Sequence, residues 1–288
     1  MRKLFLKIVR PFYELAKKNN LSAWMMFSAL GAYNNFVSRK YNKIPLAKTE
    51  YLDFTSGNKS DLCLVTIAFN NEKLIELQIV KMKEFLLDGY NLVIADNSNV
   101  PEKSLLIKEV CKKHQTTYIR LPKNPWHQAN LSHGVTLNWM YNNYILSLQP
   151  EIFGFLDHDI FLNHSASIKD KFLGDKLMYG HLQPRELASG RKFWYLWAGF
   201  CFYKSDYLLH KEINFSSVVV SRPNYFAELD SGGGNYVGVY AKTDISKVAS
   251  AQFNIGEYGE EHIDEWVHIS KASFKSSDII DKIINKVI

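Results

Sequence analysis

Four short runs of apolar residues recur through the middle of the sequence, each bounded by polar residues. They read LCLVTIAF (62–69), NLVIAD (91–96), TTYIRL (116–121) and IFGFLD (152–157). Continuous runs of this length, rich in β-branched side chains, are typical of strands that are buried on both faces of a parallel sheet. We therefore expect four such strands.

Amphipathic stretches separate these runs. Asn70 or Asn71 can cap a helix that ends near Gly89, and Pro101 is well placed to begin a second helix. A third helix is expected within residues 127–147. This alternation predicts an α/β fold with a mainly parallel sheet flanked by helices, in which ligands bind beyond the carboxyl ends of the strands.

The pattern changes after residue 176. Three strand-like runs follow without long helices between them: KLMYGHL (176–182), KFWYLWAGFCFYK (192–204) and SSVVVSR (216–222). We expect a smaller mixed sheet that completes the same domain. The chain then divides into an N-terminal helical segment with a linker (1–60), a first half of the domain (61–176), and a second half that ends in a C-terminal helix (177–288).

The positive charge of the chain is concentrated at its N-terminus. Residues 1–43 contain nine basic residues and one acid, whereas the remainder contains 26 basic and 28 acidic residues. This distribution gives no reason to expect nucleic acid as a partner. Basic residues mixed with aromatic ones suit a helix on an anionic membrane surface, and the alternative is a helical pair packed on the domain with a solvated basic face. The apolar stretch 21–36 is too short and polar to span a bilayer.

Residues 44–61 are polar and contain Pro, Gly and Ser, so we interpret them as a connector. The three cysteines, Cys63, Cys111 and Cys201, are odd in number and widely spaced. They are expected to be reduced core thiols in a cytoplasmic protein, which the basic segment could hold at the inner face of the membrane.

Two acids stand directly after the fourth apolar run, in the sequence FGFLDHD. Asp157 and Asp159 are separated by one residue, so strand geometry would place both side chains on one face. Two carboxylates at the rim of a sheet can bind one hard cation such as Mg²⁺ or Mn²⁺ together with diphosphate oxygens. The alternative is a pair of solvated acids in a turn.

These features together resemble the GT-A-fold glycosyltransferases, in particular their family 2-like group. The resemblance covers roughly residues 62–270 and includes the opening strand LCLVTIAFNNE, the acid in VIADNSN and the acid pair in DHD. It implies a nucleotide-diphospho-sugar as co-substrate, weakly favouring a UDP-type donor. It also implies that residues 61–176 form the nucleotide-sugar-binding half and residues 177–288 the acceptor-binding half.

The resemblance also implies roles for individual residues on the donor side. Asp157 and Asp159 would hold Mn²⁺ or Mg²⁺ on the diphosphate, and His268 would add a third ligand in preference to His262. Asp96 would contact the nucleobase or ribose, with Asn70 beside it.

Other roles concern the diphosphate and the acceptor. Ser132-His133-Gly134 replaces the usual Asn-x-Gly pattern, and His127 and His133 could meet the diphosphate. On the acceptor side, Asp230 would act as the general base of an inverting transfer, with Glu228 as the alternative.

Aromatic residues supply candidates for acceptor binding. Trp194 and Trp197 could form a platform for an acceptor sugar, with Gly199 leaving room for the donor sugar; the alternative is plain core packing. The resemblance further implies that the acceptor is a saccharide or a lipid-linked saccharide and that the process is bacterial surface-polysaccharide assembly.

Two other classes stay open at this point. A haloacid-dehalogenase-type phosphatase also uses Asp-x-Asp after an apolar strand, but there the motif opens the domain, whereas here three strands precede it. The third possibility is a non-catalytic sugar- or nucleotide-binding homologue.

Overall fold

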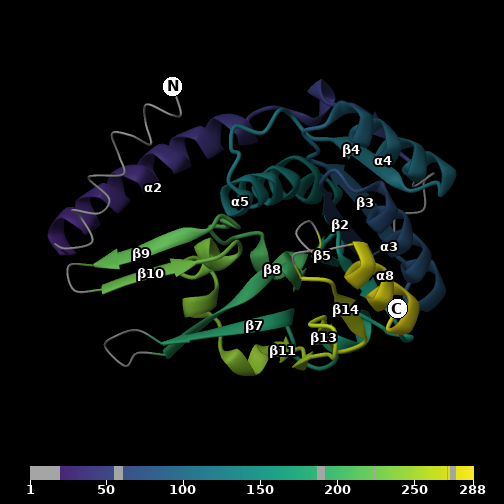
Figure 1. Cartoon of the computed structure of the whole chain (residues 1–288). Coiled ribbons are helices and arrows are strands. Elements are labelled where there is room, and N and C mark those ends of the chain that lie inside the picture. Colours follow the sequence, from purple (N-terminus) through teal and green to yellow (C-terminus); the bar gives the residue numbers. More distant parts are fainter. Residues whose placement is uncertain (1–19, 55–60, 187–191, 223–224, 271, 273–276) are drawn as a thin grey trace.

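The computed structural model describes residues 20–54, 61–186, 192–222, 225–270, 272 and 277–288. Its centre is an eight-stranded sheet with the order β1-β4-β3-β2-β5-β8-β7-β11 (Figure 1). The four predicted parallel strands form the middle of this sheet: β2 (Leu62–Ala68), β3 (Asn91–Asp96), β4 (Thr117–Arg120) and β5 (Ile152–Asp157). The predicted α/β fold class with a mainly parallel sheet is confirmed.

Helices cover both faces of this sheet, as the alternation predicts. On one face, α3 (Glu72–Phe85) and α4 (Pro101–Lys113) contribute to a core cluster with Leu64, Ile94 and Leu156. On the other face, α5 (Ala129–Met140) packs on Val65, Val93 and Phe155 and continues through a π-helical turn (η2, Tyr141–Ile145) into α6 (Leu146–Leu148).

Local sequence explains where two of these helices begin. The side chain of Asn71 accepts a hydrogen bond from the backbone N–H of Leu74, which satisfies one of the free donors at the start of α3. Pro101 occupies the first turn of α4, where its missing N–H costs nothing. Both starts agree with the sequence-based expectation.

The second half of the chain extends the same sheet. The strands β7 (Met178–Glu186), β8 (Lys192–Lys204) and β11 (Val248–Ser250) add to it beyond β5, with β8 antiparallel to both β5 and β7. The predicted strand at 216–222 instead forms a separate hairpin, made of β9 (Val218–Arg222) and β10 (Tyr225–Leu229). The short helix α7 (Ser205–Leu208) follows β8.

A second, four-stranded sheet lies beside the main one and has the order β12-β13-β14-β6. Its strands are β12 (Phe253–Ile255), β13 (Glu261–Ile263), β14 (Trp266–His268) and β6 (Ile160–Leu162). Because β6 follows β5 directly, this small sheet joins the end of the chain to the carboxyl end of the central strands. The predicted C-terminal helix is present as α8 (Ser277–Lys286) and packs on this region through Ile283.

The N-terminal helix α2 (Asn20–Asn42) lies along α5 and reaches the β9–β10 hairpin (Figure 1). Tyr41 is buried and donates to the carbonyl of Pro122, and the indole N–H of Trp139 donates to the carbonyl of Ile44. The C-terminal end of this helix is therefore anchored on the domain. No described helix is both long enough and apolar enough to cross a membrane.

The described part of the predicted connector, residues 44–54 and 61, is not entirely irregular. It contains a 3₁₀ turn (η1, Leu46–Lys48) and β1 (Tyr51–Leu52), which pairs antiparallel with β4 and forms the edge of the main sheet. A two-residue strand carries too little periodicity for the sequence to show it. All three cysteines are buried and unpaired, as expected.

Candidate functional site

Two carboxylates and one imidazole meet where the main sheet joins the small one. Asp157 ends β5, Asp159 precedes β6, and His268 ends β14. The strands β14 and β6 pair antiparallel with His268 opposite Ile160, and the N–H of Ile269 donates to the carbonyl of Asp159. One side-chain ligand atom from each of the three residues lies within 4.8 Å of the others. This spacing suits a single divalent cation, whose ligands stand about 2.0–2.6 Å from it.

His268 lies between two carboxylates, those of Asp159 and Glu261. Its Nε2 lies 3.3 Å from Oδ1 of Asp159, and its Nδ1 lies 2.7 Å from Oε2 of Glu261. Burial lowers the pKa of His268, but the hydrogen bonds with Asp159 and Glu261 outweigh it and raise this pKa to about 10. Burial opposes ionisation of Asp159 as well, and the hydrogen bond with His268 holds the pKa of that carboxyl below its ordinary value. Without a metal, the imidazolium is the cation that faces Asp159.

Asp157 faces a different histidine. Oδ1 of Asp157 lies 3.3 Å from Nε2 of His133, a residue of α5. Burial raises the pKa of Asp157; the nearby His133 opposes this rise, and the neighbouring Asp159 carboxylate adds to it. Burial is thus the main cause of the raised pKa of Asp157, and the nearby Asp159 carboxylate contributes in the same direction, as for two carboxylates that share one site.

His133 links this group to the glycine-rich segment that follows β10. Its Nδ1 lies 3.1 Å from Oγ of Ser231, whose backbone N–H donates to the side chain of Asp230. Asp230 is half-buried, and two residues, Ser231 and His133, connect it to Asp157. The side chain of Glu228, the alternative base, lies outside what the structure describes.

The side chain of Gln78 fixes the turn between Asp157 and Asp159. This residue was not among those predicted from the sequence. This buried residue of α3 donates to the carbonyls of Asp157 (2.9 Å) and Ile160 (2.8 Å). Its own side-chain oxygen accepts from the hydroxyl of Thr66 at 2.8 Å. Every polar group of the Gln78 side chain is engaged, so the helix fixes the position of the aspartate turn.

Trp197 borders the acid group. Its ring centroid lies 4.9 Å from that of His268, and 6.2 Å from that of His181, which in turn contacts Phe253 at 4.6 Å. Gly199 makes this arrangement possible: a Cβ at this position would stand 2.3 Å from the indole of Trp197 and 2.6 Å from Oδ2 of Asp157. The site has no space for a side chain there.

The structure does not bring Trp194 and Trp197 together. Trp194 packs against the core cluster on the α5 side of the sheet, with its ring 5.2 Å from that of Tyr240, whereas Trp197 packs against the cluster on the other side. The two residues are three positions apart on β8, and strand side chains alternate between faces, so their side chains leave the sheet on opposite sides. A single platform from both tryptophans is therefore absent.

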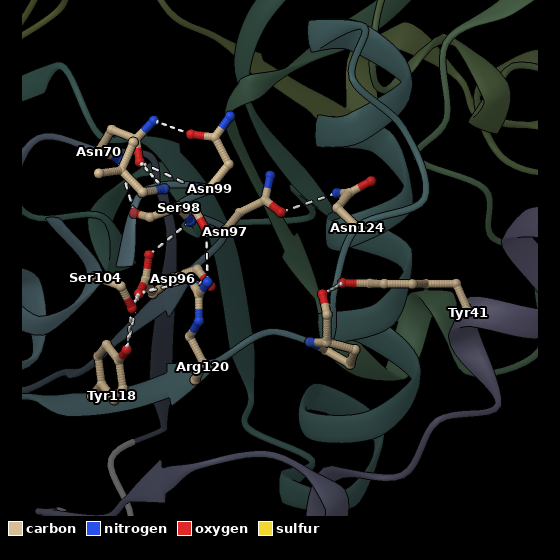
Figure 2. Close-up of polar contacts among 12 residues, drawn as sticks. Tyr41, Asn70, Asp96, Asn97, Ser98, Asn99, Ser104, Tyr118, Arg120 and Asn124 are labelled. Carbon is tan, nitrogen blue, oxygen red and sulfur yellow. Dashed lines mark hydrogen bonds and ion pairs between the residues drawn. The ribbon is translucent and has the colours of Figure 1, made fainter. Parts of the chain in front are cut away.

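Asp96 is placed at the expected edge of the sheet, but its carboxylate points inward (Figure 2). It has no exposed surface and accepts from the N–H of Ser98, from the hydroxyls of Ser104 and Tyr118, and from Arg120, whose Nη1 lies 3.0 Å away. A nucleobase would have to displace these donors to reach it. Direct contact between Asp96 and a nucleotide stays a prediction.

Amide side chains surround the outer part of this edge (Figure 2). Asn70 has a left-handed backbone (φ 52°), and its side chain bonds to Asn99 through both its oxygen and its nitrogen. Nearby, the amide of Asn124 donates to Asn97. Asn70 is thus part of a polar rim directly above the buried Asp96.

The two remaining histidine candidates do not join the acid group. His262 lies 3.3 Å from Glu260 and is not among the three residues that converge. His127 is exposed at the turn before α5. Of the histidines considered from the sequence, His133 and His268 are the two that the structure brings to the aspartates.

No family model and no curated protein matches the sequence. Solved structures with a similar arrangement include the bifunctional glycosyltransferase WbbM in its apo form (TM-score 0.36, 11% identity, covering 52% of this chain and 32% of that one). Another is the mannosyltransferase PcManGT from Pyrobaculum calidifontis, in complex with GDP-Man and Mn²⁺ (TM-score 0.35, 12% identity, covering 63% of this chain and 54% of that one). A third is the mannosyltransferase Ktr4p from S. cerevisiae (TM-score 0.37, 13% identity, covering 63% of this chain and 66% of that one).

The matched regions span about a third to two thirds of these glycosyltransferases. All three belong to the enzyme class that the sequence resembles. At such low TM-scores the neighbours assign no role to any residue, so the site is interpreted from its own side chains.

Proposed function

We propose that the chain is a metal-dependent glycosyltransferase that moves a sugar from a nucleotide-diphosphate donor to a hydroxyl of a saccharide or lipid-linked acceptor. One observation carries the proposal: Asp157, Asp159 and His268 come together at the carboxyl end of β5. In open α/β sheets this edge is where ligands bind.

The donor set fits a divalent cation. Two carboxylate oxygens and one imidazole nitrogen suit Mn²⁺ or Mg²⁺, and such a cation, when bound, would neutralise charge on a departing diphosphate. Two of the chain's own residues support this group: Gln78 fixes the turn between the aspartates, and Gly199 allows Trp197 and Asp157 to approach each other closely.

Asp230 is the proposed general base of an inverting transfer. The N–H of Ser231 donates to Oδ1 of its carboxylate at 2.7 Å, and we propose that Oδ2 accepts the proton of the attacking hydroxyl. His133 connects Ser231 to Asp157, so the proposed base and the proposed metal ligands belong to one contiguous set of contacts.

Trp197 is the proposed acceptor-binding aromatic, because it borders the acid group and Trp194 does not. The donor would lie above the rim that includes Asn70, with a UDP-type nucleotide as the first to test. The process would be bacterial surface-polysaccharide assembly, as the sequence resemblance implies.

We also propose contact with an anionic membrane through the N-terminal segment. On the described part of α2, Tyr33 and Phe36 are more than half exposed, and Arg39 and Lys40 are exposed beside them. The ammonium of Lys40 stands 4.4 Å over the ring of Phe36. Exposed aromatic and basic side chains on one helix are the combination that an interfacial helix uses. Residues 1–19 lie outside the described part.

The proposed activity is tested by thermal unfolding with a panel of nucleoside diphosphates, with and without Mn²⁺. A nucleotide that binds only the folded state stabilises it by about 2.7 kcal/mol at a hundredfold excess over Kd. We expect a metal-dependent rise in melting temperature for the wild type and for Asp170→Asn, an exposed control, but not for Asp159→Asn.

Nucleotide-sugar turnover then separates the classes. Metal-dependent release of nucleoside diphosphate supports the transferase, and binding without any turnover indicates a non-catalytic homologue. Hydrolysis of p-nitrophenyl phosphate would point instead to a phosphatase. If no nucleotide raises the melting temperature with Mn²⁺, the proposal is wrong.

A further inference from the structure

The imidazole of His268 is held from both sides. Its Nε2 faces Asp159, while its Nδ1 lies 2.7 Å from Oε2 of Glu261. Glu261 is the residue directly opposite His268 in the antiparallel β13–β14 ladder, so the two side chains leave the small sheet on the same face. The contact is therefore built into the strand register and does not depend on a loop.

Glu261 does not belong to the group that could hold the cation. The three residues whose ligand atoms converge are Asp157, Asp159 and His268, and Glu261 reaches only the far nitrogen of the ring. Its side chain is about one quarter exposed, against less than one tenth for that of His268. Its contact with the ring thus lies on the side away from the aspartates.

The two nitrogens of an imidazole are not equivalent. A carboxylate that accepts from Nδ1–H keeps the proton there, which leaves the Nε2 lone pair available to a cation and fixes the rotation of the ring. Trp197 contacts the same ring at 4.9 Å, which restricts the ring further but supplies no hydrogen bond. Among the described residues, Glu261 is the hydrogen-bond acceptor of Nδ1.

We propose that Glu261 is a positioning residue that sets the tautomer and orientation of His268 for binding of a divalent cation. This inference rests on the proposed function, because it concerns the same group of ligands. Neither the sequence pattern nor the resemblance singles out Glu261, which lies in the acid-rich stretch GEYGEEHIDE.

The test measures Mn²⁺ affinity from the electron paramagnetic resonance signal of the free ion, with three variants of the full chain. Glu261→Ala removes the acceptor, Glu261→Gln keeps a neutral acceptor oxygen, and Glu257→Ala removes an exposed acid from the preceding turn. Loss of such a partner weakens metal binding about 10–100-fold. We expect this loss for Glu261→Ala, a smaller loss for Glu261→Gln, and none for Glu257→Ala.

A second readout needs no metal. In nitrogen-15 NMR of the histidine side chains, the Nδ1–H of His268 should give a downfield, slowly exchanging proton signal because it is bonded to a largely buried carboxylate. A His268→Asn variant assigns the signal. We expect Glu261→Ala to abolish it and Glu257→Ala to retain it, with unchanged far-ultraviolet circular dichroism for both.

The outcomes separate the two proposals. If the wild type binds Mn²⁺ and Glu261→Ala binds it as tightly as Glu257→Ala, the role of Glu261 is refuted while the proposed function stands. If the wild type shows no Mn²⁺ binding, with or without a nucleoside diphosphate, the proposed function fails and the role of Glu261 fails with it. Retention of the Nδ1–H signal in Glu261→Ala would also refute the positioning role.

Discussion

Replacing Asp96 by asparagine separates two roles for this acid. If Asp96 contacts the nucleotide, the Asn variant should lose nucleotide affinity and keep its stability. The structure instead places the carboxylate in a buried network, so we expect the reverse order of effects. Asn keeps the shape of the side chain and removes its charge, which makes the substitution a test of the network and not of packing.

The magnitude follows from the partners. One carboxylate oxygen accepts from the N–H of Ser98, and the other accepts from Ser104, Tyr118 and Arg120. In the Asp96→Asn variant an amide nitrogen would face at least one of these donors, and a hydrogen bond to a charged group contributes about 1.5–3 kcal/mol. The side chain of Arg120 is about one third exposed, which weakens its share through solvent screening. We therefore expect a loss of roughly 2–4 kcal/mol in the free energy of unfolding.

The assay is urea unfolding followed by tryptophan fluorescence, with Tyr118→Phe as the matched comparison. Removing this single hydroxyl deletes one donor and should cost only about 1 kcal/mol. A nucleotide titration of the folded Asp96→Asn protein completes the experiment. A variant that unfolds within about 1 kcal/mol of the wild type, yet no longer binds nucleotide, would refute the structural role and establish Asp96 as a ligand contact.

Three further predictions follow from the site. Gly199→Ala should weaken Mn²⁺ binding at least about tenfold, because its Cβ would stand 2.6 Å from Oδ2 of Asp157. Isothermal titration calorimetry measures this loss against the control Gly89→Ala, whose added Cβ would have no atom within 4 Å. In metal-free protein, the pKa of His268 is raised from 6.5 to about 10, so its stabilising contribution is full below pH 6.5 and is lost as the pH rises through 10. The difference in urea midpoint between wild type and His268→Asn should shrink as the pH rises from 6.5 to 10. A constant difference would contradict the raised pKa of His268. Gln78→Ala leaves two backbone carbonyls without their donor and should lower the unfolding free energy by about 2 kcal/mol or more, measured by chemical denaturation.

The sequence predicted the central strands well because each is an uninterrupted apolar run. The strands at 91–96 and 152–157 have the bounds that the sequence suggested, and the helix starts marked by Asn71 and Pro101 were also predicted. These features depend on neighbours within a few residues, which a single sequence displays directly. The position of Asp157 and Asp159 at the sheet edge follows from them.

Other parts depend on pairings between distant segments. The strands β6, β13 and β14 have three residues each, too few to show a period, and Glu261 acquires its partner only through the register of β13 with β14. The inward direction of Asp96 depends on donors from α4 and β4 as well as its own loop. The separation of Trp194 from Trp197 could have been predicted, because residues three apart on a strand point to opposite faces of the sheet.

The ladder between β14 and β6 has a consequence for how this protein matures. Residues 157 and 159 emerge from the ribosome more than a hundred residues before residue 268, yet the imidazole reaches them only after β14 has docked. Loop closure over such a distance is slow compared with formation of the central βαβ units. A newly made chain could therefore hold a folded sheet for some time before it can capture a cation, and the delay between the two events would be visible in pulse-labelled refolding.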